Sequence, residues 1–435
     1  MSKSHRVMPG LIPGLALCLL LLPCLVYSQQ YYDPGIQQRS IHRKPTAYEA
    51  EGVRLGSFIL KPAVELTLEH NNNIYYIDET KVADTLFHIQ PKLALVSDWG
   101  RHALNFDAGA DIARYSDYGD EDYEDWWVTL DGRVDVKRGN TVNYGATYKQ
   151  LHEERNSPDY VHGIKPSEFS YSGFDLGYER NFNRLTANLG YDRFDTDYDN
   201  NVNSDGEIVD NQDRDRSRDT LALRLDYERS PGRSIFVGGA INNNDYDLSS
   251  DSEGYDRSSD GYRLQAGIAR DLTGVLVGDL YLEYIDQQYD DVRFDDVNGF
   301  GLGARLEWTP SKMTSVGFEF RNSPQETTQV GSSGYFSSLY AIRLQHELRR
   351  YLLANLRFSY TDNRYEANLQ SRDPSEDPNR ILNNSDVTRA DIGLTYLFSR
   401  HFFISAGYTY EKQDADVDVY NFDTNRWFLT LGLDR

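Results

Sequence analysis

The residues closest to a recognisable chemical pattern form a run of acidic and amide side chains, DTDYDNNVNSDGE, at positions 195–207. Carboxylate and amide oxygens at alternating positions are the ligands used by loops that bind Ca²⁺. This run departs from that pattern twice: Asn200 stands where the loop needs Gly, and Gly206 stands where it needs a bidentate Glu. We therefore expect no dedicated metal site, while loose binding of divalent cations by acidic loops stays open.

Catalytic side chains show no recognisable spacing either. The nine histidines are scattered without an HExxH pattern, and no serine stands out as a nucleophile. His152, followed by Glu153 and Glu154, is interpreted as part of a solvated loop edge. Both cysteines, Cys18 and Cys24, lie in the N-terminal apolar run, so we expect no thiol chemistry or disulfide in the mature chain. We expect neither enzymatic activity nor a cofactor.

Charged residues recur with a regular spacing elsewhere in the chain. In stretches such as LALRLDYE and FGLGARLEW, polar side chains alternate with apolar ones, and this period of two places them on opposite faces of a strand. A charge facing lipid costs about 2–4 kcal/mol near the bilayer midplane, so we expect the apolar face to contact lipid. The charged face would line a water-filled interior of mixed sign, and the expected pore-lining residues are Glu65, Arg133, Asp135, Arg224, Asp226, Arg263, Glu283, Arg305, Glu307, Glu319, Arg321, Arg343 and Arg357.

The overall composition agrees with this interpretation. The 435 residues include 45 Lys and Arg against 68 Asp and Glu, for a net charge of −23, which argues against binding to nucleic acid phosphates. No apolar run beyond the N-terminus approaches the roughly 18 residues that a membrane-spanning helix needs. Aromatic residues make up 13% of the chain, which is unlike disordered proteins. A Tyr-rich, Gly-rich and acidic chain suits an outer-membrane β-barrel.

The N-terminus has the features of a secretory signal peptide. A basic stretch with Lys3 and Arg6 precedes the apolar run LIPGLALCLLLLPCLVYS, and small residues precede an expected cleavage after Ser28. An uncleaved membrane anchor is the alternative. Residues 1–28 are therefore expected to be a signal peptide, and 29–56 a periplasmic lead-in with a local basic patch.

From residue 57 to 435 the connections between alternating stretches are themselves of two kinds. Eight are short, such as DWGR at 98–101 and KRGN at 137–140, and nine are longer and acidic, such as 154–168, 196–217 and 364–387. These seventeen connections predict a single antiparallel up-and-down barrel of about eighteen strands, each about ten residues long. Soluble sandwiches and propellers also have short alternating strands, but they do not usually separate short from long connections so strictly.

The first expected strand carries a family resemblance. GVRLGSFILKPAVELTLEHNNNIYY, residues 52–76, resembles the opening of a family of outer-membrane porins in which Gly-x-x-x-Gly-Ser-Phe leads to a Pro, a hydrophobic strand and an Asn-rich turn. His70-Asn71-Asn72 departs from the acidic residue expected there. Members of that family often occur beside genes for exopolysaccharide biosynthesis and export, so the resemblance implies a role in polysaccharide export.

The sequence thus predicts a channel in the outer membrane of a Gram-negative bacterium, surrounded by lipid. The leading interpretation is a passive conduit for exopolysaccharide, with a periplasmic export protein as a possible partner. A general diffusion porin for small hydrophilic solutes is the alternative, and a barrel that binds a surface through its acidic loops is a third. The sequence leaves open the polymer or solute, the oligomeric state and whether the pore is plugged.

Overall fold

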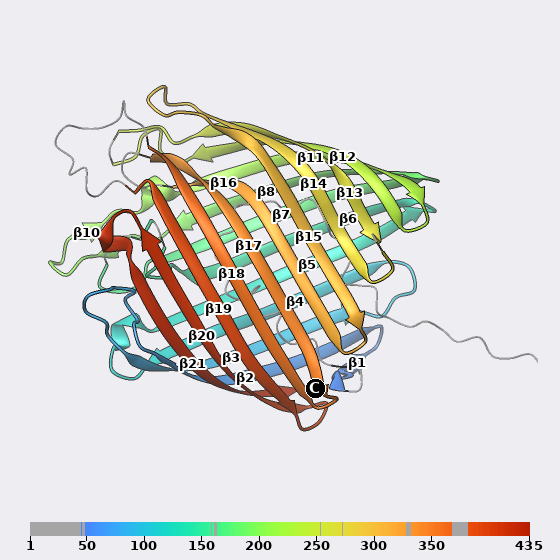
Figure 1. Ribbon diagram of the computed structural model, residues 1–435, viewed down its shortest axis with the longest axis horizontal. Helices are drawn as coiled ribbons and strands as arrows, with labels where there is room; N and C mark the ends of the chain where they lie inside the picture. The colour runs from blue at the N-terminus through green and yellow to red at the C-terminus, as the bar shows by residue number, and fades with distance from the viewer. Residues whose placement is uncertain are drawn as a thin grey trace, which may run out of the picture.

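The chain forms one large antiparallel barrel (Figure 1). The computed structural model describes residues 45, 48–157, 159–160, 163–252, 254–271, 273–327, 332–367 and 382–435. The expected signal peptide and most of the expected lead-in lie outside these residues, as does much of the connection expected at 364–387. Within the described residues, no helix is long and apolar enough to cross a membrane.

Eighteen strands follow one another around the barrel in sequence order, and the last pairs with the first. Ala63–Asn71 of the first strand lie against Arg426–Asp434 of the last, so the sheet has no open edge there. The predicted eighteen-stranded barrel is confirmed. The strands are β2 (Phe58–Asn71), β3 (Asp84–Ser97), β4 (Ala103–Tyr115), β5 (Tyr123–Lys137), β6 (Asn140–His152), β7 (Glu168–Phe182), β8 (Leu185–Tyr198), β11 (Arg216–Ser230), β12 (Arg233–Tyr246), β13 (Ser259–Asp271), β14 (Leu276–Tyr289), β15 (Val297–Ser311), β16 (Thr314–Glu326), β17 (Ser332–Arg349), β18 (Leu352–Ala367), β19 (Asn384–Leu397), β20 (Phe402–Ala415) and β21 (Phe422–Asp434).

The strands are longer than the ten residues expected from bilayer thickness. They run from 13 residues in β4 to 18 in β17, so pairing continues past the stretch that lipid requires. A further short strand, β1 (Val53–Leu55), lies in the segment expected as lead-in and folds back on Phe58–Leu60. Gly56 closes this hairpin with a φ of 63°, a conformation that favours glycine.

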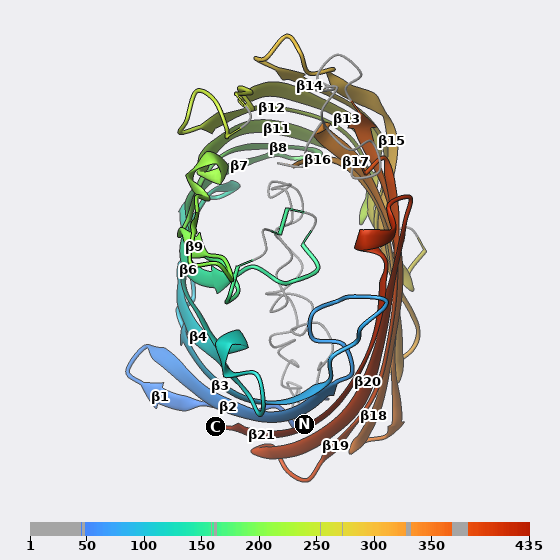
Figure 2. The ribbon, with the colours of Figure 1, turned by 90° about the vertical axis from the view of Figure 1, so that its left-hand side faces the viewer.

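Short and long connections gather at opposite ends of the barrel, as the sequence predicts. The short turns lie at 138–139, 183–184 and 231–232 and at the equivalent places between later strands. The longer loops carry the small elements, namely β9 (Asn201–Val202), β10 (Ile208–Val209), η2 (Gly119–Glu121), η3 (Gln212–Arg214) and η5 (Asp418–Tyr420). Figure 2 looks into the barrel from the end that carries these loops.

The two faces of the sheet differ as alternation requires. Leu223 is 46% exposed on the outer face, whereas its neighbour Arg224 is 8% exposed on the inner face. Aromatic rings also pair on the outer face, both in the middle of strands and near their ends. Tyr408 packs on Trp427 with ring centroids 4.3 Å apart, and Tyr351 on Tyr396 at 5.2 Å. Such rings suit the two membrane–water interfaces.

Candidate functional site

The interior of the barrel contains a cavity of about 480 Å³ on the side formed by β2, β3 and β15–β21. Of the thirteen predicted pore-lining residues, Glu65, Glu307, Arg343 and Arg357 line this cavity. Strand alternation places the other nine on the same inner face of the sheet. Their role in passing a solute stays a prediction, because a position on the inner wall does not by itself measure conduction.

Most of these predicted charges are held in ion pairs with each other. Arg224 contacts Asp226 at 2.9 Å and Asp279 at 3.5 Å, and its guanidinium stacks on Phe236. Other ion pairs on the inner wall join Arg133 to Asp135, Arg263 to Glu283, Arg305 and Arg343 to Glu319, and Lys92 to Glu65. These charges therefore neutralise one another locally, as expected for a solvated wall of mixed sign.

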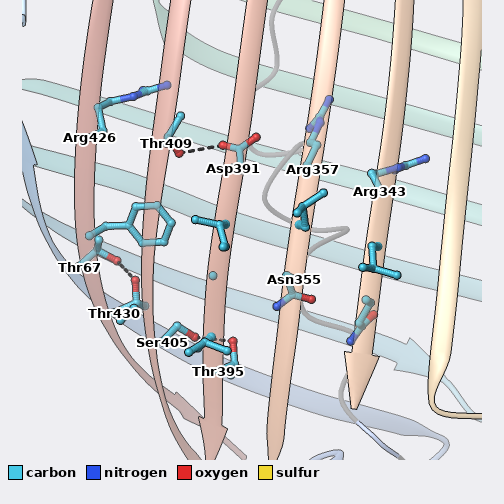
Figure 3. A pocket seen from close by; sticks show the side chains of 18 of the residues that line it. Thr67, Arg343, Asn355, Arg357, Asp391, Thr395, Ser405, Thr409, Arg426 and Thr430 are labelled. Carbon is cyan, nitrogen blue, oxygen red and sulfur yellow. Dashed lines mark hydrogen bonds between the residues drawn. The ribbon is translucent and has the colours of Figure 1, made fainter. Parts of the chain in front are cut away.

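The cavity wall also contains polar residues that sequence analysis did not single out. Hydroxyl groups bond across strands there, with Thr67 Oγ1 2.8 Å from Thr430 Oγ1 and Thr395 Oγ1 2.9 Å from Ser405 Oγ (Figure 3). The same alternation signal continues through the last three strands and would have placed these residues inside. The further cavity-lining residues used below are Asn355, Arg389, Asp391, Thr409 and Arg426.

Four arginines on this wall form what we call the arginine row: Arg343, Arg357, Arg389 and Arg426. Arg343 and Arg357 are direct cross-strand partners on β17 and β18. On β19, Arg389 bonds to Asp391 and also to Glu411, and Arg426 on β21 contacts Glu411 at 3.1 Å. The row therefore spans five adjacent strands on one side of the lumen.

The facing wall carries carboxylates, which we call the acidic row: Asp131, Asp175 and Asp192. Register places them at one level, because Asp131 pairs with Gly145, Gly145 with Asp175, and Asp175 with Asp192. Asn105 donates a hydrogen bond to Asp131 at 2.9 Å. Among the described residues, no Lys or Arg is seen in an ion pair with Asp131 or Asp175, while Arg218 interacts electrostatically with Asp192. The lumen therefore has walls of opposite character.

One loop folds from the end of β6 into the lumen, and its described residues are 153–157, 159–160 and 163–167 (Figure 2). Two charged contacts hold its base. The buried carboxylate of Glu153 accepts two hydrogen bonds from Arg214, at 2.5 and 2.9 Å, and Arg155 donates to Glu121 at 2.8 Å. We call this segment the inward loop. Carboxylate–arginine pairs with two bonds fix geometry as well as contributing energy.

The inward loop contacts distant parts of the barrel. Asn156 donates to Glu411 on β20 at 3.0 Å, and Thr327, between β16 and β17, donates to Asp159 at 2.6 Å. Because Glu411 also holds Arg389 and Arg426, the loop reaches the same carboxylate that orders the arginine row. The loop therefore crosses the lumen from the acidic wall to the arginine wall.

Electrostatics at the base of the inward loop reflect crowding of acidic groups. Burial raises the pKa of Glu154, and the nearby carboxylates of Asp125 and Glu411 raise it further, while His152 and Arg426 oppose the shift.

The expectation that His152 is solvated is wrong. Its side chain is buried, bonds Asp125 at 3.0 Å and stacks on the ring of Tyr123, because the loop that follows turns inward rather than outward.

The acidic run at 195–207 and the two inward-facing aromatic residues form neither a metal site nor an aromatic track. Residues 195–198 of the acidic run belong to β8 and 201–202 to β9, so this run is not a single loop. In the described ranges, no group of three or more His, Cys, Asp or Glu side chains is placed to hold a metal ion. Trp127 and Tyr281, both on the inner face, lie over Gly109 and Gly303 of neighbouring strands. A methyl group at either glycine would overlap the ring, so both aromatics serve as wall packing.

Comparison with known proteins was made at three levels. A search of curated protein sequences gives no match. Among solved structures, the barrel is similar to the outer membrane protein OpdK of Pseudomonas aeruginosa, with 11% identity, 86% of this chain and 99% of that chain covered, and a TM-score of 0.43. It is also similar to the siderophore receptor PiuA of Acinetobacter baumannii, with 10% identity, 89% and 82% coverage, and a TM-score of 0.47.

The family comparison covers nearly the whole barrel. Residues 44–435 match the family described as "Putative beta-barrel porin 2". That range includes every strand of the closed ring and the cavity between its walls. The chain therefore belongs to this β-barrel porin family and is an outer-membrane protein of a Gram-negative bacterium with the fold of a channel.

Proposed function

We propose that this porin is a passive channel for small hydrophilic solutes and that the inward loop limits their size. The observation that carries the proposal is the pair of contacts from Asn156 to Glu411 and from Thr327 to Asp159, which fasten the loop across the lumen. A barrel of about eighteen strands is otherwise wide enough for an open aqueous channel. A fastened loop divides that space into narrower paths, which suits solutes rather than polymers.

The wall chemistry supports passage of solutes without tight binding. Hydroxyl and amide groups line the cavity beside mostly paired charges, so a hydrated solute can exchange hydrogen bonds with the wall as it moves. Nothing in this arrangement requires a chemical step, and the porin family and the fold point to a channel rather than to an enzyme.

Export of exopolysaccharide is the finer alternative, and it is favoured by the resemblance of residues 52–76. A hydrated polymer would need the inward loop to leave the lumen, with loss of the contacts at Asn156 and Asp159. A periplasmic export protein would have to supply that displacement. The two functions therefore differ in what happens to the loop, and this difference can be measured.

The test uses the purified full chain in planar bilayers and in liposomes swollen by sugars of increasing size. Asn156→Ala combined with Asp159→Ala should raise single-channel conductance and admit larger sugars, because both cross-lumen contacts are removed. Asn203→Ala is the matched control, since Asn203 bonds only within the β9–β10 hairpin region of its own loop. A wild-type protein that conducts no ions would overturn the proposal, as would a double variant with unchanged conductance and size limit.

A deletion strain separates the two functions in cells. A passive solute channel predicts slower uptake of small hydrophilic solutes and unchanged surface polysaccharide. Loss or periplasmic trapping of one exopolysaccharide with normal solute uptake would instead overturn the proposal and favour export.

A further inference from the structure

We infer that Arg357 and Asn355, with Arg343 beside them, form a binding site for the carboxylate of small organic anions inside this channel. This inference rests on the proposed function and assigns it a class of solute. Figure 3 shows the three side chains projecting from β17 and β18 into the cavity.

Arg343 and Arg357 place two positive charges at one level of the sheet. They are direct cross-strand partners, whose Cβ atoms lie roughly 4.5–5.5 Å apart in such pairs. Like charges directly opposite each other are destabilising in a sheet. Glu319 lies 3.7 Å from Arg343, so the charge without a carboxylate partner in this pair is that of Arg357, and an anion beside it would relieve the repulsion.

Arg357 differs from the other arginines on the inner wall in its partners. Arg224 has two carboxylates within reach, and Arg389 is bonded to both Asp391 and Glu411. Arg357 has no carboxylate within ion-pairing distance anywhere in the described part of the chain. Asp391, its cross-strand neighbour on β19, is already bonded to Arg389 and accepts from Thr409 at 2.8 Å. The carboxylate that register places beside Arg357 is thus bonded to other groups.

Two buried donors on β18 lack an acceptor among the described residues. They are Nε of Arg357 and Nδ2 of Asn355. The two residues are separated by one position, so both side chains point to the inner face of the strand. A carboxylate has two oxygens that accept several hydrogen bonds, and a planar guanidinium matches it with two parallel bonds. One ligand carboxylate would therefore satisfy the donors that the wall leaves open.

The site has the character expected of a transfer point rather than of a tight receptor. The cavity is open to the aqueous lumen, which screens charge, and the hydroxyl groups of Thr409, Ser405 and Thr395 continue the polar wall beyond the arginines. Conduction requires binding that is favourable enough to enter and weak enough to leave. We therefore expect affinity that is measurable as block of ion current at high probe concentration.

The experiment measures the block of single-channel current by succinate in planar bilayers containing the purified full-length porin. Arg357→Gln should raise the half-blocking concentration by about tenfold, because hydrogen bonds from a charged donor are the strong ones. Arg357→Lys keeps the charge without the paired bonds and should fall between wild type and Arg357→Gln. Succinamide, which has the same shape without charge, should not block.

Arg224→Gln is the matched control. It removes the same charge from the inner wall outside the cavity lining, and it should change the half-blocking concentration by less than about twofold, because Asp226 and Asp279 already pair with Arg224 and the lumen between it and the site screens charge. Equal block of wild type and Arg357→Gln, in channels of normal conductance, would overturn the inference alone. Equal loss of block in Arg357→Gln and Arg224→Gln would also overturn it, since total charge rather than the site would then decide. Absence of any wild-type conductance would instead overturn the proposed function.

Discussion

The two walls of the lumen are built by the same strand alternation and carry opposite charges. On β5, β7 and β8, the acidic row places three carboxylates at one level with a glycine between the first two. On β17–β21, the arginine row places four guanidinium groups, two of them tied to Glu411. The net charge of −23 reveals neither wall, because most of the excess acid lies elsewhere. Local pairing determines the field that a solute meets.

The inward loop joins these two walls, and its base gives the largest expected effect. Arg214→Leu would leave Glu153 buried without its cation, which costs about 3–5 kcal/mol for a buried pair. We expect the loop to detach, so that the walls face each other across open water. Hydrogen exchange of residues 153–157 and single-channel conductance should both rise.

The control for this change is an exposed pair in the same loop. Lys165→Gln removes the contact of Lys165 with Glu168, which is worth about 0–1 kcal/mol at the surface. If Lys165→Gln and Arg214→Leu loosen the loop equally, the buried pair does not hold it.

The charge of the acidic row can be removed by substitutions that leave the contacts of the inward loop unchanged. Asp131→Asn combined with Asp175→Asn should increase the preference for anions over cations, by a factor of about five at most for each carboxylate, because a unit charge about 4 Å away in water contributes about 1 kcal/mol. The reversal potential across a salt gradient measures this preference. Asp205→Asn with Glu207→Gln removes the same charge from an outer loop and should shift the potential less. A larger shift in that control would assign selectivity to the loops instead of to the wall.

The smallest expected effect is a pH dependence of the stability of the loop that carries Arg214. Burial raises the pKa of Asp215 to about 6, assisted by Asp197 and Asp247. The pKa of an Asp in the unfolded chain is about 3.9, so between pH 3.9 and 6 the folded loop binds more protons than the unfolded loop. The free energy of unfolding of the loop therefore decreases as pH rises through about 6. Proteolysis of the loop at 199–215 should therefore accelerate from pH 4 to 7, and Asp215→Asn should remove the slope.

Asp291 provides a control of opposite sign. Its hydrogen bonds with Arg293 lower its pKa to about 2. The ionised Asp291 therefore contributes its full stabilisation of the fold above the pKa of an unfolded Asp, and this stabilisation is lost only as pH falls through about 2. Asp291→Asn should leave the slope of loop proteolysis between pH 4 and 7 unchanged. A slope that disappears in both variants would mean that Asp215 is not its source.

The fold was predictable from sequence because its signals are local and repeated. Alternation in stretches such as LALRLDYE fixes which side of a strand meets lipid, and the sorting of connections fixes strand number and order. Strand length was underestimated because hydrogen bonding continues beyond the bilayer in β17. Beyond the bilayer, polar residues occupy both faces of the strand, so the alternation of polar and apolar residues no longer marks where the strand ends.

The site was less predictable because it depends on contacts between distant strands. Glu411 and Asn156 are separated by 255 positions, and nothing in either local sequence indicates that a polar loop turns inward. The thirteen charges named from alternation did not include Arg389 or Arg426, although the same pattern extends to them. That Arg357 lacks a carboxylate partner follows only from register, since Asp391 lies beside it but bonds elsewhere.

Closure of the ring has a consequence for how the protein matures. The first and last strands must meet, and Thr67 bonds to Thr430 across 363 positions of the chain. Such a long-range contact forms late, because the entropy of closing the intervening chain must be overcome first. Until the final strand has left the translocation machinery, the sheet has two unpaired edges. Both edges of an incomplete sheet therefore stay available for pairing with other chains until the strand at 422–434 arrives.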